Sequence, residues 1–105
     1  MSNMENKLFD DSFKKVSGAQ IRASRALLGW SQEYLRSMAS LTQGPIARME
    51  NDVSKSKDST LRLVIKVLEE AGIEFFWDDD GTVGLKLKPT DKYFLADKNN
   101  LSQNK

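Results

Sequence analysis

The stretch that decides the fold is residues 29–51, which read GWSQEYLRSMASLTQGPIARMEN. Ser31 is a favourable N-cap for a short helix that ends near Ala39. After a connection of three residues, Thr42 is expected to cap another helix, and Pro45 falls in its first turn, where the missing N–H costs little. Two short helices at this spacing predict a helix-turn-helix.

A further helix is predicted on the N-terminal side of this pair, over residues 18–28. Ser17 and Gln20 form a capping-box pattern at its start, because each side chain can bond the backbone N–H of the other residue. Gly29 can adopt the left-handed conformation that closes a helix. On the C-terminal side, residues 51–57 are polar and lack periodicity, so they are expected to form a loop.

The clearest helical pattern lies between residues 58 and 72. Asp58 or Ser59 is expected to be its N-cap, and Gly72 its C-cap. Its apolar residues recur at i, i+3, i+4 and i+7, which places them on one buried face. These residues are Leu61, Val64, Ile65 and Leu68.

Beyond residue 72 the apolar period changes from that of a helix to that of a strand, which predicts strands over residues 73–77 and 83–87. Asp80-Gly81, between them, is a favoured pair for a tight hairpin turn. A two-stranded hairpin is marginal alone in water and needs a partner surface. It can fold back on the helices or pair edge to edge with a second copy, and we favour the second arrangement because one DNA-binding module rarely supplies specific affinity. The expected dimer interface consists of Phe75, Trp77, Val83, Leu85 and Leu87.

The composition narrows the class of function. A chain of 105 residues has room for one core, and the lack of cysteine and histidine removes disulfides, zinc fingers, thiol nucleophiles and the imidazole base, so no enzymatic activity and no cofactor are expected. The run Asp78-Asp79-Asp80 lacks further oxygen ligands at loop spacing, which favours a turn over a metal site. No apolar run approaches the ~20 residues of a bilayer span and the N-terminus has no signal sequence, so the expected location is the cytoplasm, without membrane contact.

Charge is unevenly distributed along the chain, although the net charge is only +1. Between residues 18 and 50, four arginines oppose two glutamates, a net charge of +2. Residues 72–81 carry four acidic side chains and no basic one, a net charge of −4, and the segment from residue 82 onward carries +3. A protein that contacts DNA at one end can carry its acidic turn at the other.

Two runs carry a resemblance to a known family, GWSQEYL at residues 29–35 and LTQGPIARMEN at residues 41–51. They resemble the lambda-repressor-like XRE family of bacterial and phage regulators, and the resemblance covers residues 18–72. It implies a mainly α fold, a lambda-repressor-like helix-turn-helix bundle of four to five short helices, followed by a C-terminal β-hairpin. The residues that recur in register are Gln32, Leu35, Ile46, Glu50 and Asn51.

The expected domain organisation has four parts. Residues 1–16 form an N-terminal arm or short helix, and residues 17–72 form the helix-turn-helix DNA-binding domain. Residues 73–89 form the hairpin, with a role in dimerisation, and residues 90–105 form a flexible tail. The tail contains one apolar cluster, Tyr93-Phe94-Leu95.

The resemblance implies DNA contacts for the matched positions. It makes residues 42–50 the expected recognition helix in the major groove. Gln43 can bond adenine N6 and N7, and Arg48 can bond either guanine O6 and N7 or a phosphate. The implied base-contacting residues are Gln43, Gly44, Ala47 and Arg48. The implied phosphate-contacting residues are Ser31, Gln32, Thr42, Asn51 and Lys55.

Arg25 and Glu50 stand where the family places an internal ion pair. Both lie on apolar helix faces, where an unpaired charge would be costly, so we expect a structural pair that orients residues 42–50. Two positions depart from the family pattern, because Arg36 replaces a small residue and Ser40 replaces a glycine. Arg36 must therefore reach around the contact between the two helices or alter it.

Together these features predict a sequence-specific double-stranded DNA-binding transcriptional regulator. It is expected to be a repressor in the nucleoid that acts as a homodimer on a palindromic operator. The alternative is an antitoxin that controls its own operon and binds a toxin protein through the tail or the hairpin, and a co-transcribed toxin gene would favour it. A protein-interaction module with no role on DNA is a third alternative.

Overall fold

The computed structural model describes residues 12–42 and 44–89 of the chain. Within these residues there are four α-helices, two short 3-10 helices and one antiparallel hairpin. In chain order the elements are η1 (Ser12–Lys15), α2 (Gly18–Leu28), α3 (Gln32–Met38), α4 (Pro45–Asn51), η2 (Val53–Lys55), α5 (Asp58–Glu70), β1 (Ile73–Trp77) and β2 (Val83–Leu87). The predicted fold class, a mainly helical bundle with a C-terminal hairpin, is confirmed.

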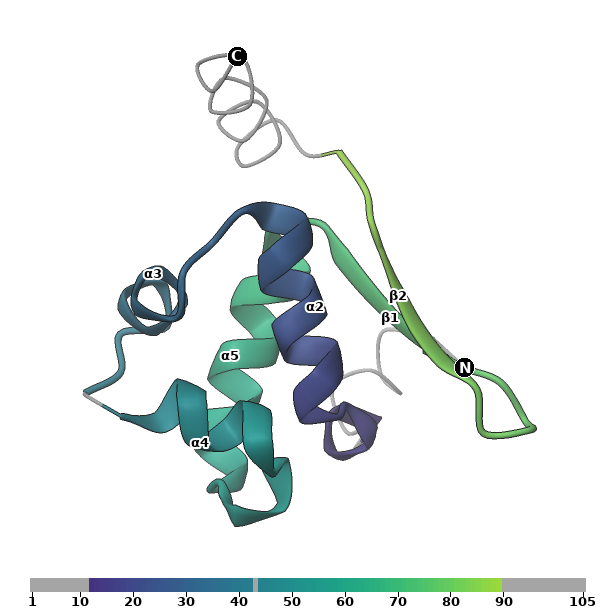
Figure 1. The fold of residues 1–105 in the computed structure, drawn as a ribbon, viewed down its shortest axis with the longest axis horizontal. Coiled ribbons are helices and arrows are strands. Elements are labelled where there is room, and N and C mark those ends of the chain that lie inside the picture. Colours follow the sequence, from purple (N-terminus) through teal and green to yellow (C-terminus); the bar gives the residue numbers. More distant parts are fainter. Residues whose placement is uncertain (1–11, 43, 90–105) are drawn as a thin grey trace, which may run out of the picture.

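The helices enclose the hydrophobic core, and the hairpin closes it on one side (Figure 1). Figure 1 shows α3 and α4 on the side of α2 and α5 that lies away from the hairpin. Phe13 and Val16, from η1 and the residue after it, are 8% and 1% exposed, so the described end of the predicted N-terminal arm enters the core. The largest fully buried side chains include Ile21, Leu28, Leu35, Met49 and Leu68.

α2 has the predicted bounds and the predicted caps. The Ser17 hydroxyl accepts from Gln20 N–H at 3.1 Å, and Ser17 N–H donates to Gln20 Oε1 at 3.0 Å, which completes the capping box. Gly29 closes the helix with a left-handed φ of 73°. Local sequence signals are therefore sufficient to define this helix.

The helix predicted from Thr42 begins instead at Pro45. Gly44 has φ 95°, in the left-handed region that a right-handed helix excludes, and Pro45 supplies the φ of a first helical residue. Gly44 is the N-cap and has no side chain with which to cap α4. The prediction that Thr42 caps this helix is therefore wrong, and the connection between α3 and α4 spans residues 39–44 instead of 40–42.

The boundaries around α5 also differ from the prediction. Lys57 is its N-cap, without a side-chain bond, and Asp58 already lies in the first turn. Ala71 is its C-cap, one residue before Gly72, which has φ 111° and leads into β1. The predicted loop 51–57 contains the last residue of α4 and the short helix η2. The apolar stripe of α5 is buried as predicted, at Leu61, Val64, Ile65 and Leu68.

β1 and β2 have the predicted bounds and pair antiparallel, with Phe75 opposite Leu85. Gly81 N–H donates to Asp78 O at 3.0 Å, and Asp78 N–H donates to Thr82 O at 2.8 Å. Gly81 has φ 91°, which glycine adopts without strain. The acidic segment is therefore a tight hairpin turn, as predicted.

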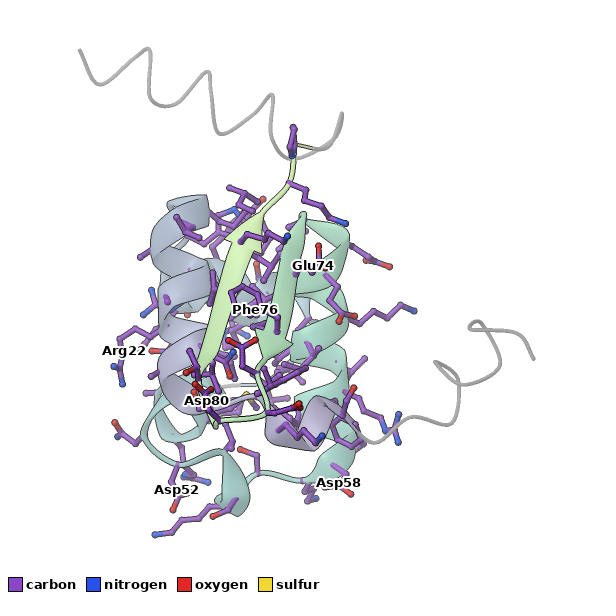
Figure 2. All side chains as sticks on the ribbon, turned by 90° about the vertical axis from the view of Figure 1, so that its right-hand side faces the viewer. Arg22, Asp52, Asp58, Glu74, Phe76 and Asp80 are labelled. Carbon is purple, nitrogen blue, oxygen red and sulfur yellow. The ribbon has the colours of Figure 1, made fainter. Side chains whose placement is uncertain are left out.

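One face of the hairpin packs on the helices, with β2 over α2 and β1 over α5 (Figure 2). Gln20 on α2 donates its side-chain N–H to Gly84 O at 2.9 Å, and Trp77 Nε1 donates to Lys15 O at 3.1 Å. On the outer face Phe76 lies on Gly84, where a Cβ would come within 2.5 Å of the ring. The hairpin thus folds back on its own domain.

Candidate nucleic-acid interface

α4 has one buried and one exposed face. Ile46, Met49 and Glu50 are at most 4% exposed and pack toward the core. The residues at i, i+3, i+4 and i+7, counted from the N-cap, lie on the opposite side and are exposed. They are Gly44, Ala47, Arg48 and Asn51, all of which the resemblance associates with DNA contacts.

A hollow of about 260 Å³ lies beside the N-terminal end of α4, and its described lining contains basic side chains but no acidic one. Lys57 and Thr60 are among the lining residues that were not predicted as contacts. The alternation of serine and lysine at residues 54–57 is a signal for Lys57, whereas Thr60 joins the hollow only because the first turn of α5 lies there. The lining residues with predicted DNA contacts are Thr42, Gly44, Arg48 and Lys55.

The other predicted contacts that the structure describes lie outside this hollow. The Ser31 hydroxyl caps α3 by accepting from Tyr34 N–H at 2.9 Å. Gln32 is exposed, but its Nε2 donates to Glu50 Oε1 at 3.1 Å, so the side chain faces the inner side of α4. Gln43, the residue predicted to bond adenine, lies outside the described residues.

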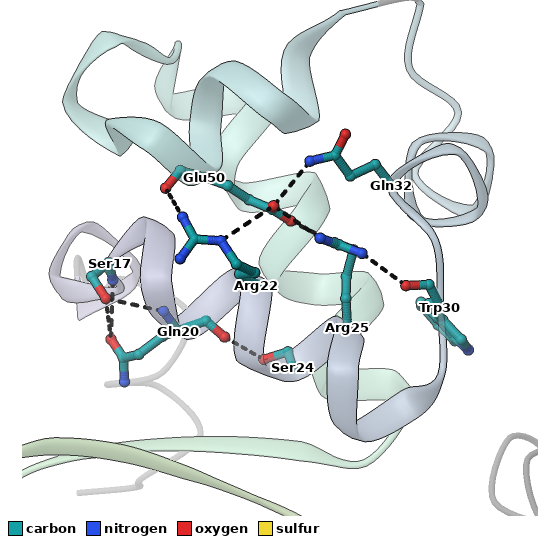
Figure 3. A network of polar contacts seen from close by, with 8 residues as sticks. All are labelled: Ser17, Gln20, Arg22, Ser24, Arg25, Trp30, Gln32 and Glu50. Atoms are coloured by element: carbon teal, nitrogen blue, oxygen red, sulfur yellow. Dashed lines mark hydrogen bonds and ion pairs between the residues drawn. The ribbon is translucent and has the colours of Figure 1, made fainter.

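The predicted pair of Arg25 and Glu50 is present, and it is the centre of a cluster of polar contacts (Figure 3). Arg25 Nε and Nη2 donate to the two carboxylate oxygens of Glu50 at 2.6 and 3.0 Å, a bidentate arrangement. Arg25 Nη1 also donates to Trp30 O at 2.9 Å. Arg22 Nη2 donates to Glu50 O at 3.2 Å, near the end of α4. With the bond from Gln32, the cluster joins α2, α3 and α4.

The cluster is buried and ionised. The side chain of Glu50 is 3% exposed, and that of Arg25 is 17% exposed. Burial by itself raises the pKa of Glu50, but hydrogen bonds from Arg25 and Gln32, together with nearby positive charge, hold this pKa below its ordinary value. The hydrogen bond to Glu50 raises the pKa of Arg25, so both partners keep their charge in the folded protein.

α2 also approaches the end of α4 closely. A Cβ on Gly18 would lie 2.1 Å from Glu50 O and 2.8 Å from Met49 O, so a larger residue would push the two helices apart. Gly18 is the first residue of α2, directly after the Ser17 cap. This contact and the Glu50 cluster together hold α4 in one direction relative to α2.

Arg36 reaches around the contact between α3 and α4. Its guanidinium pairs with Glu33 on the same helix, and its Nη1 donates to Leu41 O at 2.5 Å. Ser40, in the connection between α3 and α4, takes a left-handed φ of 56°. Leu41 N–H donates to Arg36 O at 3.0 Å, so backbone and side chain of Arg36 both hold the turn.

The side chains predicted to form a dimer interface lie on the hairpin face that covers the helices. Phe75 is buried, and Trp77, Leu85 and Leu87 are partly buried against the core. Val83, near the turn, is 47% exposed. A second chain that contacts the hairpin would therefore have to use a strand edge or the outer face.

Among the residues that the structure describes, no group of acidic side chains is arranged to hold a metal ion. In the acidic turn, one oxygen of Asp80 accepts from Thr82 N–H at 3.0 Å, and this bond lowers the pKa of Asp80.

None of the helices within 12–42 and 44–89 has the length and apolar character needed to cross a membrane.

Comparison with known proteins found no family model, no curated protein and no solved structure that matches the chain. The basis for a function is therefore the geometry itself. It consists of the exposed face of α4, the basic hollow beside it and the buried cluster behind it.

Proposed function

We propose that this protein binds double-stranded DNA in a sequence-specific manner, with α4 in the major groove, and acts as a transcriptional regulator. The observation that carries the proposal is the division of α4 into a face locked to the core by Glu50 and an exposed face at residues 44, 47, 48 and 51. A single α-helix fits the major groove, where base edges can be read. The resemblance to XRE family regulators supports the same role for this helix.

Rigid attachment of α4 is the second support. Base reading requires side chains to be held within fractions of an ångström of a productive position. Arg25 and Gln32 both bond the carboxylate of Glu50, so α2 and α3 position α4 from two directions. The close approach of Gly18 to the end of α4 adds a steric constraint.

The exposed side chains suit different parts of DNA. Arg48 can bond guanine O6 and N7 or a phosphate, and the methyl group of Ala47 can contact a thymine methyl. Lys55 and Lys57 share the hollow with Arg48, and their charges can neutralise backbone phosphates on the same side of the domain. The proposed recognition surface therefore combines few base-reading groups with several backbone contacts.

Selection of bound duplexes from a random pool, followed by fluorescence anisotropy at several salt concentrations, tests the proposal. Arg48→Ala should weaken binding to the selected duplex about tenfold or more, because a bidentate base contact contributes about 1–3 kcal/mol. Lys86→Ala, on the outer face of the hairpin, is the matched control and should leave the affinity within about twofold. A pool with no enriched sequence, or unchanged binding by Arg48→Ala, would refute the proposal.

The phosphate contacts have their own signature. The double variant Lys55→Ala/Lys57→Ala should weaken binding to all duplexes to a similar extent and lower the slope of log affinity against log salt by about two.

The proposal also includes two copies on one operator, since a single module rarely supplies specific affinity. A palindrome in the selected duplexes would support this arrangement, and a lone half-site would contradict it. An antitoxin would use the same surface on DNA, and binding of a toxin protein would distinguish it.

A further inference from the structure

Among the described residues, no strand pairs with the outer edge of β1. In the described sheet β1 has β2 as its only neighbour. The bond from Asp78 N–H to Thr82 O, 2.8 Å long, sets the phase of the ladder, because bonded and non-bonded pairs alternate along antiparallel strands. The backbone groups that point away from β2 are therefore those of Ile73, Phe75 and Trp77.

A groove of about 780 Å³ runs along this edge, between β1, η1 and the flank of α5. Apolar surface beside an unpaired strand edge is the surface that an added strand covers. The other strand is positioned differently, because Gln20 ties β2 to α2. The apolar lining of the groove consists of Phe13, Val16, Ile65, Ile73, Phe75 and Trp77.

Five charged side chains line the described part of the groove, and two of them, Glu74 and Lys88, pair with each other at 3.5 Å near Ile73. The other three leave opposite signs at the two ends. Arg62 lies at the end near η1, where its guanidinium stacks 4.1 Å from the centre of the Phe13 ring. Because α5 runs antiparallel to β1, Glu69 lies at the opposite end, near Ile73, and Lys66 lies between the two. The groove is therefore complementary in charge to a copy of itself turned end to end.

We infer that a second copy of this chain binds along the groove, with the two β1 strands paired edge to edge about a two-fold axis at Phe75. We call this interface between the two β1 strands the seam. In this register Phe75 lies opposite Phe75 of the partner subunit, and Ile73 lies opposite Trp77 of the partner subunit, so outward N–H and C=O groups bond across the seam. The rotation also brings Arg62 to Glu69 of the partner subunit. The two hairpins form one continuous sheet, and the predicted apolar side chains remain on each domain's own core.

Sedimentation equilibrium of the full chain without DNA tests the seam. It should show a reversible dimer. Arg62→Glu and Glu69→Arg should each raise the dimer dissociation constant about tenfold, because each single variant places like charges opposite each other in two symmetric positions. The double variant Arg62→Glu/Glu69→Arg should recover most of the affinity. Lys86→Glu, on the outer face, is the matched control and should leave the dissociation constant unchanged.

Amide hydrogen exchange identifies the strand. Protection of the Phe75 amide should increase with protein concentration, whereas protection of the outward amide of Leu85 on β2 should not. A monomer at all concentrations, or concentration-dependent protection of Leu85 instead of Phe75, would overturn the inference. Phe75 protected equally at all concentrations would also overturn it, because the groove would then be filled within one chain. Thermal unfolding of each variant, measured on dilute protein, reports the stability of the monomer. A variant with an unchanged midpoint but a higher dimer dissociation constant has lost affinity at the seam and not stability of the fold.

The seam and the proposed function can fail separately. The groove and the exposed face of α4 have no described residue in common, since the groove is lined from η1, α5, β1 and their neighbours. A dimer that selects no DNA sequence would leave the seam standing and refute the proposed function. A monomer that selects a sequence would do the reverse.

Discussion

Two arginine–glutamate pairs in this chain have the same chemistry in different surroundings. Arg25 pairs with Glu50 and Arg36 pairs with Glu33, and each arginine also donates to a backbone carbonyl beyond the end of its helix. The carboxylate side chain is 3% exposed in the first pair and 75% exposed in the second. The buried pair connects separate helices, whereas the exposed pair lies within α3.

The difference shows that geometry alone does not determine what an ion pair contributes. Removing one partner of a buried pair leaves a desolvated charge without compensation, while water and salt replace the lost partner at the surface. The Glu50 cluster therefore maintains the arrangement of the domain. The Glu33–Arg36 pair instead affects one turn, the one that leads into α4.

The largest expected effect comes from Glu50→Ala. It should lower the free energy of unfolding by about 3–5 kcal/mol, because Arg25 loses its buried counter-charge. Urea denaturation at neutral pH measures this loss. Glu33→Ala is the control and should leave the denaturation midpoint almost unchanged. Similar losses in the two variants would show that burial does not separate the two pairs.

The dependence of stability on pH is the next expected effect. The pKa of Glu50 is lower in the folded state than in the unfolded state, so its contribution is complete above the ordinary glutamate pKa and is lost as the pH falls through the folded value. Urea denaturation of the wild type and of Glu50→Gln from pH 7 down to pH 3 should give curves that converge in acid. Parallel curves would mean that Glu50 titrates alike in both states.

The smallest expected effect on stability comes from Arg36→Ala. The unfolding midpoint should change little, because the side chain bonds the exposed Glu33 and one turn carbonyl. If the proposed function holds, affinity for the selected duplex should nevertheless fall several-fold, since the turn no longer holds the start of α4. Glu33→Ala, which keeps the bond from Arg36 to Leu41, should lose less affinity. Equal losses would assign the effect to the pair instead of the turn.

Local signals predicted much of the fold. The capping box at Ser17 and the glycine at residue 29 define α2, and the apolar stripe of α5 and the two-residue period of the hairpin were read correctly. The start of α4 was misplaced because Thr42 is a good cap by residue type, whereas the left-handed Gly44 interrupts the helix. The bond from Gln32 to Glu50 was missed because an exposed glutamine carries no sequence signal for its partner.

The sequence by itself determined the helical and strand segments apart from the start of α4, because caps and periodicity are local properties. The candidate ion pair of Arg25 and Glu50 came from the resemblance to a family with a pair at these positions, supported by the apolar helix faces on which both residues lie. Only the tertiary structure decided how the helices are joined through Glu50, how Arg36 holds the turn, and which face of the hairpin is covered. These features depend on contacts between residues far apart in the chain. A strand reveals which residues share a face, but the packing of the whole domain decides whether that face meets its own core or a partner.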